Sequence, residues 1–224
     1  MQNIDDQIEA LHIEGLRELV DYYRSYDRQI SEVRKKYNFY CVNRCGACCM
    51  TPSKNIEAST FEMVPMAIEI IHEHKDDLFL KSLDASGIDK IPCVIYQKIS
   101  LDGREGYCSR YGSRPLICRL FGGGTRLNRN AERELILCRP LKKNQYISAE
   151  SLAMVTEKMP LSSEVSTYVR GLNNDIDPAL YAINVALKKA LEYILFKLHW
   201  LNPEAPEPGS PPFGTPPGHF PVAA

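Results

Sequence analysis

The sequence has 224 residues, enough for one sizeable domain with its own core, and its formal net charge of −1 gives no general attraction to nucleic acid or membranes. No stretch approaches 18 consecutive apolar residues, which excludes a membrane-spanning helix. The first residues contain acids in place of a basic segment followed by an apolar run, so no secretory signal is predicted. We therefore expect a cytoplasmic protein whose thiols are kept reduced.

An apolar stripe runs through residues 4–37, from Ile4 to Tyr37, in steps of 4, 3 and 4 residues. This period is close to that of an α-helix, and it predicts one nearly straight helix of roughly 50 Å. We expect the helix to pack on the C-terminal helices, with self-association as the alternative.

The middle of the chain predicts shorter elements. Ser59-Thr-Phe-Glu62 has the pattern of a capping box, which predicts a helix from Thr60 to about His74. Ser113-Arg-Pro115 predicts a second helix start with Ser113 as the cap. Two hairpins are also expected, one between Cys93 and Cys108, and one with its tip at 128–130 and a return strand over 134–138. Gly122-Gly-Gly124 is predicted to be a turn, although it could also form an anion-binding nest.

The C-terminal part is helical by pattern over 149–159 and 178–200, and a proline-rich tail follows that is predicted to be disordered. The sequence therefore predicts a mainly α (α+β) fold around a small, irregular, cysteine-rich centre. Its expected parts are a long N-terminal helix (1–38), a cysteine-cluster metal-binding domain (39–145), C-terminal helices that pack on it (146–201) and the tail (202–224).

All eight cysteines lie in the middle of the chain, and four of them fall within nine residues; they are Cys41, Cys45, Cys48, Cys49, Cys93, Cys108, Cys118 and Cys138. A reducing compartment disfavours disulfides, and a catalytic thiol would explain one or two cysteines but not eight. Thiolates are preferred ligands of zinc and of iron–sulfur clusters. We therefore predict a metal site with all eight as candidate ligands. They could fill two four-coordinate centres, or four could ligate one centre while the others are spare or structural.

The spacing adds one detail. Cys45 and Cys48 bracket Gly46-Ala47, a small knuckle that lets backbone amides turn towards bound sulfur. The adjacent Cys48 and Cys49 cannot easily both point inward from a regular helix or strand. We expect either an irregular backbone there or two thiols that serve different partners.

The cysteine-rich part is also basic. Residues 104–143 contain ten Arg or Lys against three Glu, a net charge of +7. Nearby guanidinium groups would stabilise an anionic thiolate site, but a solvated basic surface is an equally good explanation. Binding of nucleic acid is a weaker reading that would need stacking aromatic residues beside the arginines.

Two segments resemble a known family. Cys45-Gly-Ala-Cys48-Cys49, together with the stretch from Tyr107 to Gly122, is similar to the bacterial YkgJ-like CxxCxxCC family, which is regarded as zinc- or iron-chelating and includes the flagellin lysine N-methylases. The resemblance covers roughly residues 40–140. The gap of three residues between Cys41 and Cys45 is one wider than the nominal pattern.

The resemblance implies metal chelation, most plausibly of an iron–sulfur cluster of the [4Fe–4S] type, with Zn²⁺ as the competing occupant. It also carries over Tyr111, Arg114, Pro115 and Arg119 of the second motif, with Arg114 and Arg119 as candidates to hydrogen-bond the cluster or an anionic ligand. Its methylase members imply an alternative function, transfer of a methyl group from S-adenosylmethionine to a protein lysine. Metal binding is the first hypothesis and this methyltransferase activity, with a protein as substrate, is the second.

Overall fold

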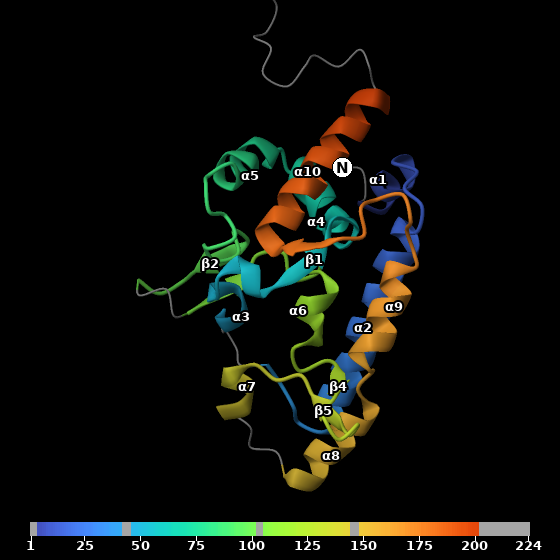
Figure 1. Cartoon of the computed structure of the whole chain (residues 1–224), viewed down its shortest axis with the longest axis vertical. Coiled ribbons are helices and arrows are strands. Elements are labelled where there is room, and N and C mark those ends of the chain that lie inside the picture. The colour runs from blue at the N-terminus through green and yellow to red at the C-terminus, as the bar shows by residue number, and fades with distance from the viewer. Residues whose placement is uncertain (1–3, 42–45, 102–104, 144–147, 202–224) are drawn as a thin grey trace, which may run out of the picture.

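The computed structural model describes residues 4–41, 46–101, 105–143 and 148–201. Its described part is mainly α-helical with three short antiparallel strand pairs, which confirms the predicted fold class (Figure 1). The elements are α1 (Ile4–Ala10), α2 (Leu16–Lys36), α3 (Ala47–Met50), the 3₁₀ turn η1 (Ser53–Asn55), β1 (Glu57–Ser59), α4 (Thr60–His72), α5 (Asp76–Leu83), β2 (Tyr96–Lys98), β3 (Gly106–Cys108), α6 (Leu116–Leu120), β4 (Thr125–Leu127), β5 (Arg133–Leu135), α7 (Arg139–Lys143), α8 (Ala149–Lys158), α9 (Ser162–Arg170), β6 (Leu180–Ala182) and α10 (Ile183–Leu201).

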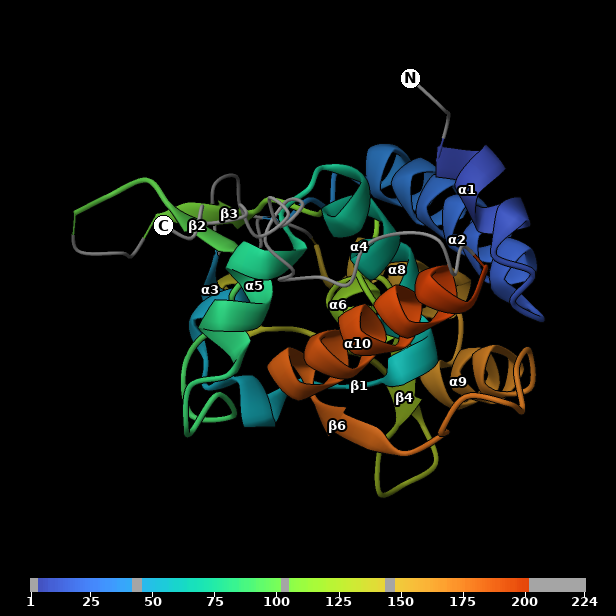
Figure 2. The same cartoon turned by 90° about the horizontal axis from the view of Figure 1, so that it is seen from above.

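Helices α4 and α10 form the centre of the core. Strands β1 and β6 pair antiparallel, and each leads directly into one of these helices. Because the strands are antiparallel, the two helices start at opposite ends of the pair, and they pack against each other (Figure 2). Helix α4 is apolar nearly all round, with ten buried residues, as expected for a helix enclosed by others.

The predicted single helix over 4–37 is wrong, because the chain breaks into α1 and α2. His12 and Gly15 have positive φ angles of 47° and 71°, which end α1 and start α2. The backbone carbonyl of Leu172 lies only 2.0 Å from the place where a Cβ of Gly15 would be. The apolar stripe continues across the break because both helices bury one face in the same core. Helix α2 then packs on α4 and α8, and its Tyr22 contacts Tyr168 of α9 with ring centroids 4.6 Å apart.

Several local predictions are confirmed. The capping box is present, with the Ser59 hydroxyl accepting from the Glu62 amide and the Glu62 carboxylate accepting from the Ser59 amide. Both hairpins form, β2 with β3 and β4 with β5, although the second return strand covers 133–135. Gly122–Gly124 is a turn, and its three amides all donate to backbone carbonyls of Ile136 or Leu120, which leaves no anion-binding nest.

Two predicted helix starts are wrong. Helix α6 begins at Leu116 with Pro115 as its N-cap residue, while the Ser113 hydroxyl donates to Glu69 at 2.7 Å. The amide of Leu116 donates instead to the carboxylate of Glu62 at 3.0 Å, so another helix supplies the cap. The last helix begins at Ile183, because the residues before it pair with β1 as strand β6.

In the C-terminal part, α8 lies where a helix was predicted, and α9 is an additional helix. Among the described helices, none combines the length and the hydropathy that a bilayer-spanning segment needs. The predicted tail over 202–224 lies outside the described residues.

Substitution of Gly15 tests the break between α1 and α2. We expect Gly15→Ala to lower the free energy of unfolding by at least about 2 kcal/mol, because the methyl group would meet the Leu172 carbonyl and the residue would keep a positive φ. In one continuous helix the same change would stabilise by about 0.5–1 kcal/mol. Urea denaturation measures whether the substitution lowers or raises the free energy of unfolding. Gly171→Ala is the control, since its Cβ would make only ordinary contacts at 3.5 Å.

Candidate metal centre

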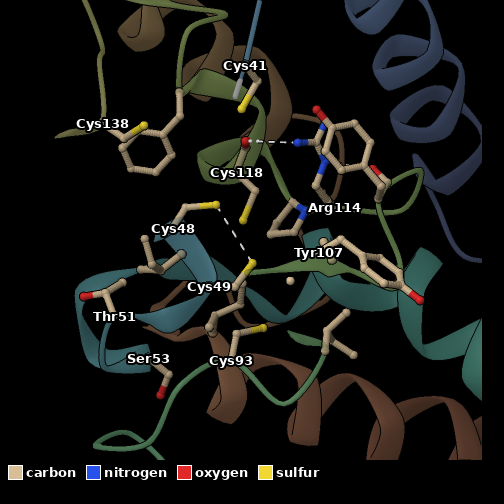
Figure 3. A pocket seen from close by; sticks show the side chains of 18 of the residues that line it. Cys41, Cys48, Cys49, Thr51, Ser53, Cys93, Tyr107, Arg114, Cys118 and Cys138 are labelled. Carbon is tan, nitrogen blue, oxygen red and sulfur yellow. Dashed lines mark hydrogen bonds between the residues drawn. The ribbon is translucent and has the colours of Figure 1, made fainter. Parts of the chain in front are cut away.

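Seven of the eight cysteines line one cavity of about 420 Å³. They come from the segment after α2 (Cys41), α3 (Cys48, Cys49), the loop before β2 (Cys93), β3 (Cys108), α6 (Cys118) and the segment between β5 and α7 (Cys138). Figure 3 labels all of them except Cys108, and shows Cys41 and Cys138 on one side of the cavity and Cys93 on the other. Cys45, also a predicted ligand, lies outside the described residues.

Both Cys48 and Cys49 reach the cavity, and their sulfur atoms are 3.9 Å apart. This is possible because α3 is a single turn of four residues. The backbone amides of Cys49 and Met50 hold it by donating hydrogen bonds to the Gly46 carbonyl. Gly46 has no room for a side chain, since a Cβ would lie 1.9 Å from the Tyr96 ring. Both adjacent thiols therefore line the cavity from a one-turn helix, and whether they serve different partners stays a prediction.

The other thiols are held by hydrogen bonds from neighbouring segments. The Cys93 amide donates to the Cys49 carbonyl at 3.0 Å, which joins its loop to α3. Cys108 lies opposite Tyr96 in the β2–β3 pair. The Cys138 carbonyl accepts from the Lys142 amide at 3.0 Å, so this cysteine stands directly before α7.

Cys118 depends on a buried carboxylate that sequence reasoning recognised only as part of a helix cap. Glu62 accepts from the Leu116 amide at the start of α6 and from the Tyr23 hydroxyl at 3.2 Å, in addition to its bonds within the capping box. Glu62 thereby joins the first residue of α6, which lies two residues before Cys118, to α4 and α2. The capping-box pattern identified Glu62, but no sequence signal could reveal its second role.

The three polar residues implied by the resemblance are placed differently. Arg114 lines the cavity, stacks on the Tyr111 ring at 3.3 Å and donates to the Tyr111 and Cys118 carbonyls. Tyr111 also lines the cavity and is half exposed. The Arg119 side chain points elsewhere: it is 1% exposed, forms an ion pair with Asp27 and lies over the Tyr23 ring.

The basic residues of this region fall into two groups, those that pair with carboxylates and those that line the cavity. Arg110 and Arg126 are paired with Glu73 and Glu134, so these charges are neutralised locally. Arg114 and Arg34 of α2 line the cavity, and in the described part of the chain neither forms an ion pair with a carboxylate. Arg34 donates to the carbonyls of Gly122 and Phe121. Sequence analysis missed Arg34, because it lies about 80 residues from the other basic residues of the site.

The protonation of the thiols follows from their contacts. The pKa of Cys48 is lowered to about 6, chiefly by the hydrogen bond from Cys49 and further by the charge of Arg114. The pKa of Cys108 is lowered to about 7, chiefly by the hydrogen bond with Cys49 and further by a backbone hydrogen bond from Arg110 and the charge of Arg114. The pKa of Cys49 is raised because its proton is shared with the sulfur atoms of Cys108 and Cys48. Burial raises the pKa of Cys93 to about 12 and also raises that of Cys118.

The donor set fits a metal group, because thiolates are preferred ligands of zinc and of iron–sulfur clusters. Two thiolates on one zinc ion are about 3.8 Å apart, since each Zn–S bond is about 2.3 Å in a tetrahedral site. Cys48 and Cys49 have such a separation, but within the described ranges no set of three His, Cys, Asp or Glu side chains converges on a single ion position. The remaining thiols surround a cavity many times the roughly 30 Å³ of one water molecule.

Thiol reactivity in the metal-free protein tests these electrostatics. At pH 7 we expect iodoacetamide to alkylate Cys48 and Cys108 faster than Cys93 and Cys118, because the thiolate is the nucleophile. A lowered pKa keeps the thiolate present above that pKa, so labelling of Cys48 should fall as the pH drops below about 6. Peptide mass spectrometry measures the rates. Equal rates in the folded protein, as in a urea-unfolded control, would contradict the assignment.

Comparison with known proteins agrees with this site. No curated protein and no solved structure matches the chain. Residues 40–139 match the model of the CxxCxxCC family, described as a “Putative zinc- or iron-chelating domain”. The matched segment covers under half of the chain and carries all eight cysteines, so this part of the chain is similar to that family.

Proposed function

We propose that this protein binds an iron–sulfur cluster, of the [4Fe–4S] type, through cysteine thiolates of the cavity. The observation that carries the proposal is the convergence of seven cysteines, from segments up to 97 residues apart in sequence, on one cavity. Each iron of such a cluster takes its own thiolate, so the ligands surround a volume and do not meet at a point. The described thiols have this arrangement, whereas a zinc site would need four of them to close around one ion.

Charge supports the same occupant. A cluster with four thiolates is an anion, and Arg114 and Arg34 bring two guanidinium groups to the cavity wall without a carboxylate partner among the described residues. Arg114 already stabilises the thiolate forms of Cys48 and Cys108. When bound, a cluster would supply one-electron redox chemistry or a rigid structural centre.

Five thiols form the inner part of the site. The pKa values of Cys48, Cys49, Cys93, Cys108 and Cys118 are each shifted by the charge or the hydrogen bond of another member of this group. We propose that the cluster ligands come from these inner thiols, with Cys41 and Cys138 at the far side of the cavity. None of the seven is in a disulfide with another described residue, and a reducing compartment such as the cytoplasm would keep them available. Methyl transfer is not proposed, since no described residue of the cavity favours S-adenosylmethionine over another ligand.

Metal analysis of anaerobically purified protein tests this function. We expect iron and acid-labile sulfide in similar amounts and a broad visible absorption band. Zinc without iron would overturn the cluster, and folded protein that takes up neither iron nor zinc would overturn metal binding altogether.

Substitution of Cys118 tests the site. We expect Cys118→Ser to remove most of the metal and to destabilise the middle of the chain, because metal binding and folding are linked in such sites. Val165→Thr in α9 is a matched control, since it also places a hydroxyl group in the core but lies outside the cavity wall. Metal content per folded protein, measured by elemental analysis and circular dichroism, should fall only in the first variant.

A further inference from the structure

The segment that brings Cys93 to the cavity has little structure of its own. Residues 88–95 form turns and irregular backbone between α5 and β2. The Cys93 amide donates to the Cys49 carbonyl, which joins the loop to α3. Further hydrogen bonds to carbonyls of the loop come from Ser53, Lys54 and Ser109. These partners lie in or next to short elements of the same site, and one longer element also binds the loop.

That element is α10, through the side chain of Asn184. Asn184 lies in the first turn of α10 and is 1% exposed. Its amide oxygen accepts from the Val94 amide at 3.0 Å, and its amide nitrogen donates to the carbonyls of Ile88 and Pro92 at 2.9 and 3.0 Å. The side chain therefore binds the residues immediately before and after Cys93.

We propose that Asn184 is a positioning residue of the metal site, which sets the place of the Cys93 sulfur relative to the other inner thiols. The inference rests on the proposed metal-binding function. Removing the amide would leave the Val94 N–H and the Pro92 carbonyl without these partly buried hydrogen bonds, and the Ile88 carbonyl would keep only its bond from the Ser53 hydroxyl, so the loop would relax away from α10. Residues that orient metal ligands are typically worth 10–100-fold in metal affinity.

Asn184 lies outside the segment that matches the CxxCxxCC family. Residue 184 lies 45 residues beyond the end of the matched segment 40–139. The family domain therefore does not hold Cys93 in place by itself, and α10 is part of the metal site.

The chain offers a matched control in Asn173. This buried asparagine also makes three hydrogen bonds to backbone, donating to the Glu14 carbonyl and accepting from the amides of Asp175 and Ile176. It clamps the junction of α1 and α2 and does not line the cavity. Asn184→Ala and Asn173→Ala should lower the stability of the metal-free protein by similar amounts.

The first experiment measures metal loss from the full-length, metal-loaded variants to an excess of chelator. We expect Asn184→Ala to lose metal at least about tenfold faster than the wild type and to change the absorption spectrum, while Asn173→Ala behaves like the wild type. Equal rates for the two variants would overturn the inference. Wild-type protein that takes up no metal would instead defeat the proposed function.

A double-mutant cycle shows whether Asn184 acts through Cys93. In a Cys93→Ser background, Asn184→Ala should change the rate of metal loss less than about twofold, because the ligand that it positions is already absent. A full tenfold effect in that background would assign Asn184 a general structural role and contradict the proposal.

A metal-free readout keeps the inference testable if Cys93→Ser cannot be loaded. The Cys93 side chain is partly buried and its pKa is raised, so we expect slow alkylation in the wild type and in Asn173→Ala, and at least about fivefold faster alkylation in Asn184→Ala. Asn184→Ser, which keeps a small polar side chain, replaces the alanine variant if that variant does not fold. Unchanged Cys93 labelling in a folded Asn184 variant would overturn the positioning role.

Discussion

The thiol-bearing segments of this protein are too short to fold by themselves, so contacts with the rest of the structure must hold them in place. Helix α3 has four residues, α6 has five, and β2 and β3 have three each. Such elements make too few internal hydrogen bonds to offset the entropy of ordering them. Their positions are therefore set from outside, by buried side chains on the long helices behind the cavity.

Two of these side chains make the same kind of contact. Glu62 of α4 binds the first amide of α6, and Asn184 of α10 binds both sides of Cys93. Helices α4 and α10 are in turn fixed by the β1–β6 pair and by a shared apolar interface. Because each contact satisfies buried polar groups, a loss at either position would leave unpaired backbone atoms next to the site. The central helices thus act as the rigid support of an irregular ligand shell.

The electrostatics of the cavity follow from the same architecture. Burial of the five thiols favours their neutral forms, yet the pKa values of Cys48 and Cys108 are lowered because each is hydrogen-bonded with Cys49 and lies near the charge of Arg114. These shifts favour the thiolate forms of Cys48 and Cys108, the forms that bind metal. Arg114 is itself held by stacking on Tyr111 and by carbonyls, and not by a carboxylate that would compete for its charge.

The sequence by itself determined the parts of this protein that depend on local chemistry. The density of cysteines indicated a metal site, the Ser59 to Glu62 pattern located the start of α4, and turn residues located both hairpins. Only the tertiary structure decided that Gly15 breaks the first helix, that Arg119 pairs with Asp27 away from the cavity, and that Glu62 and Asn184 support Cys118 and Cys93. The reason is physical: periodicity and spacing report interactions over a few residues. These contacts join residues 54 to 157 positions apart, where the partner is chosen by how the helices pack.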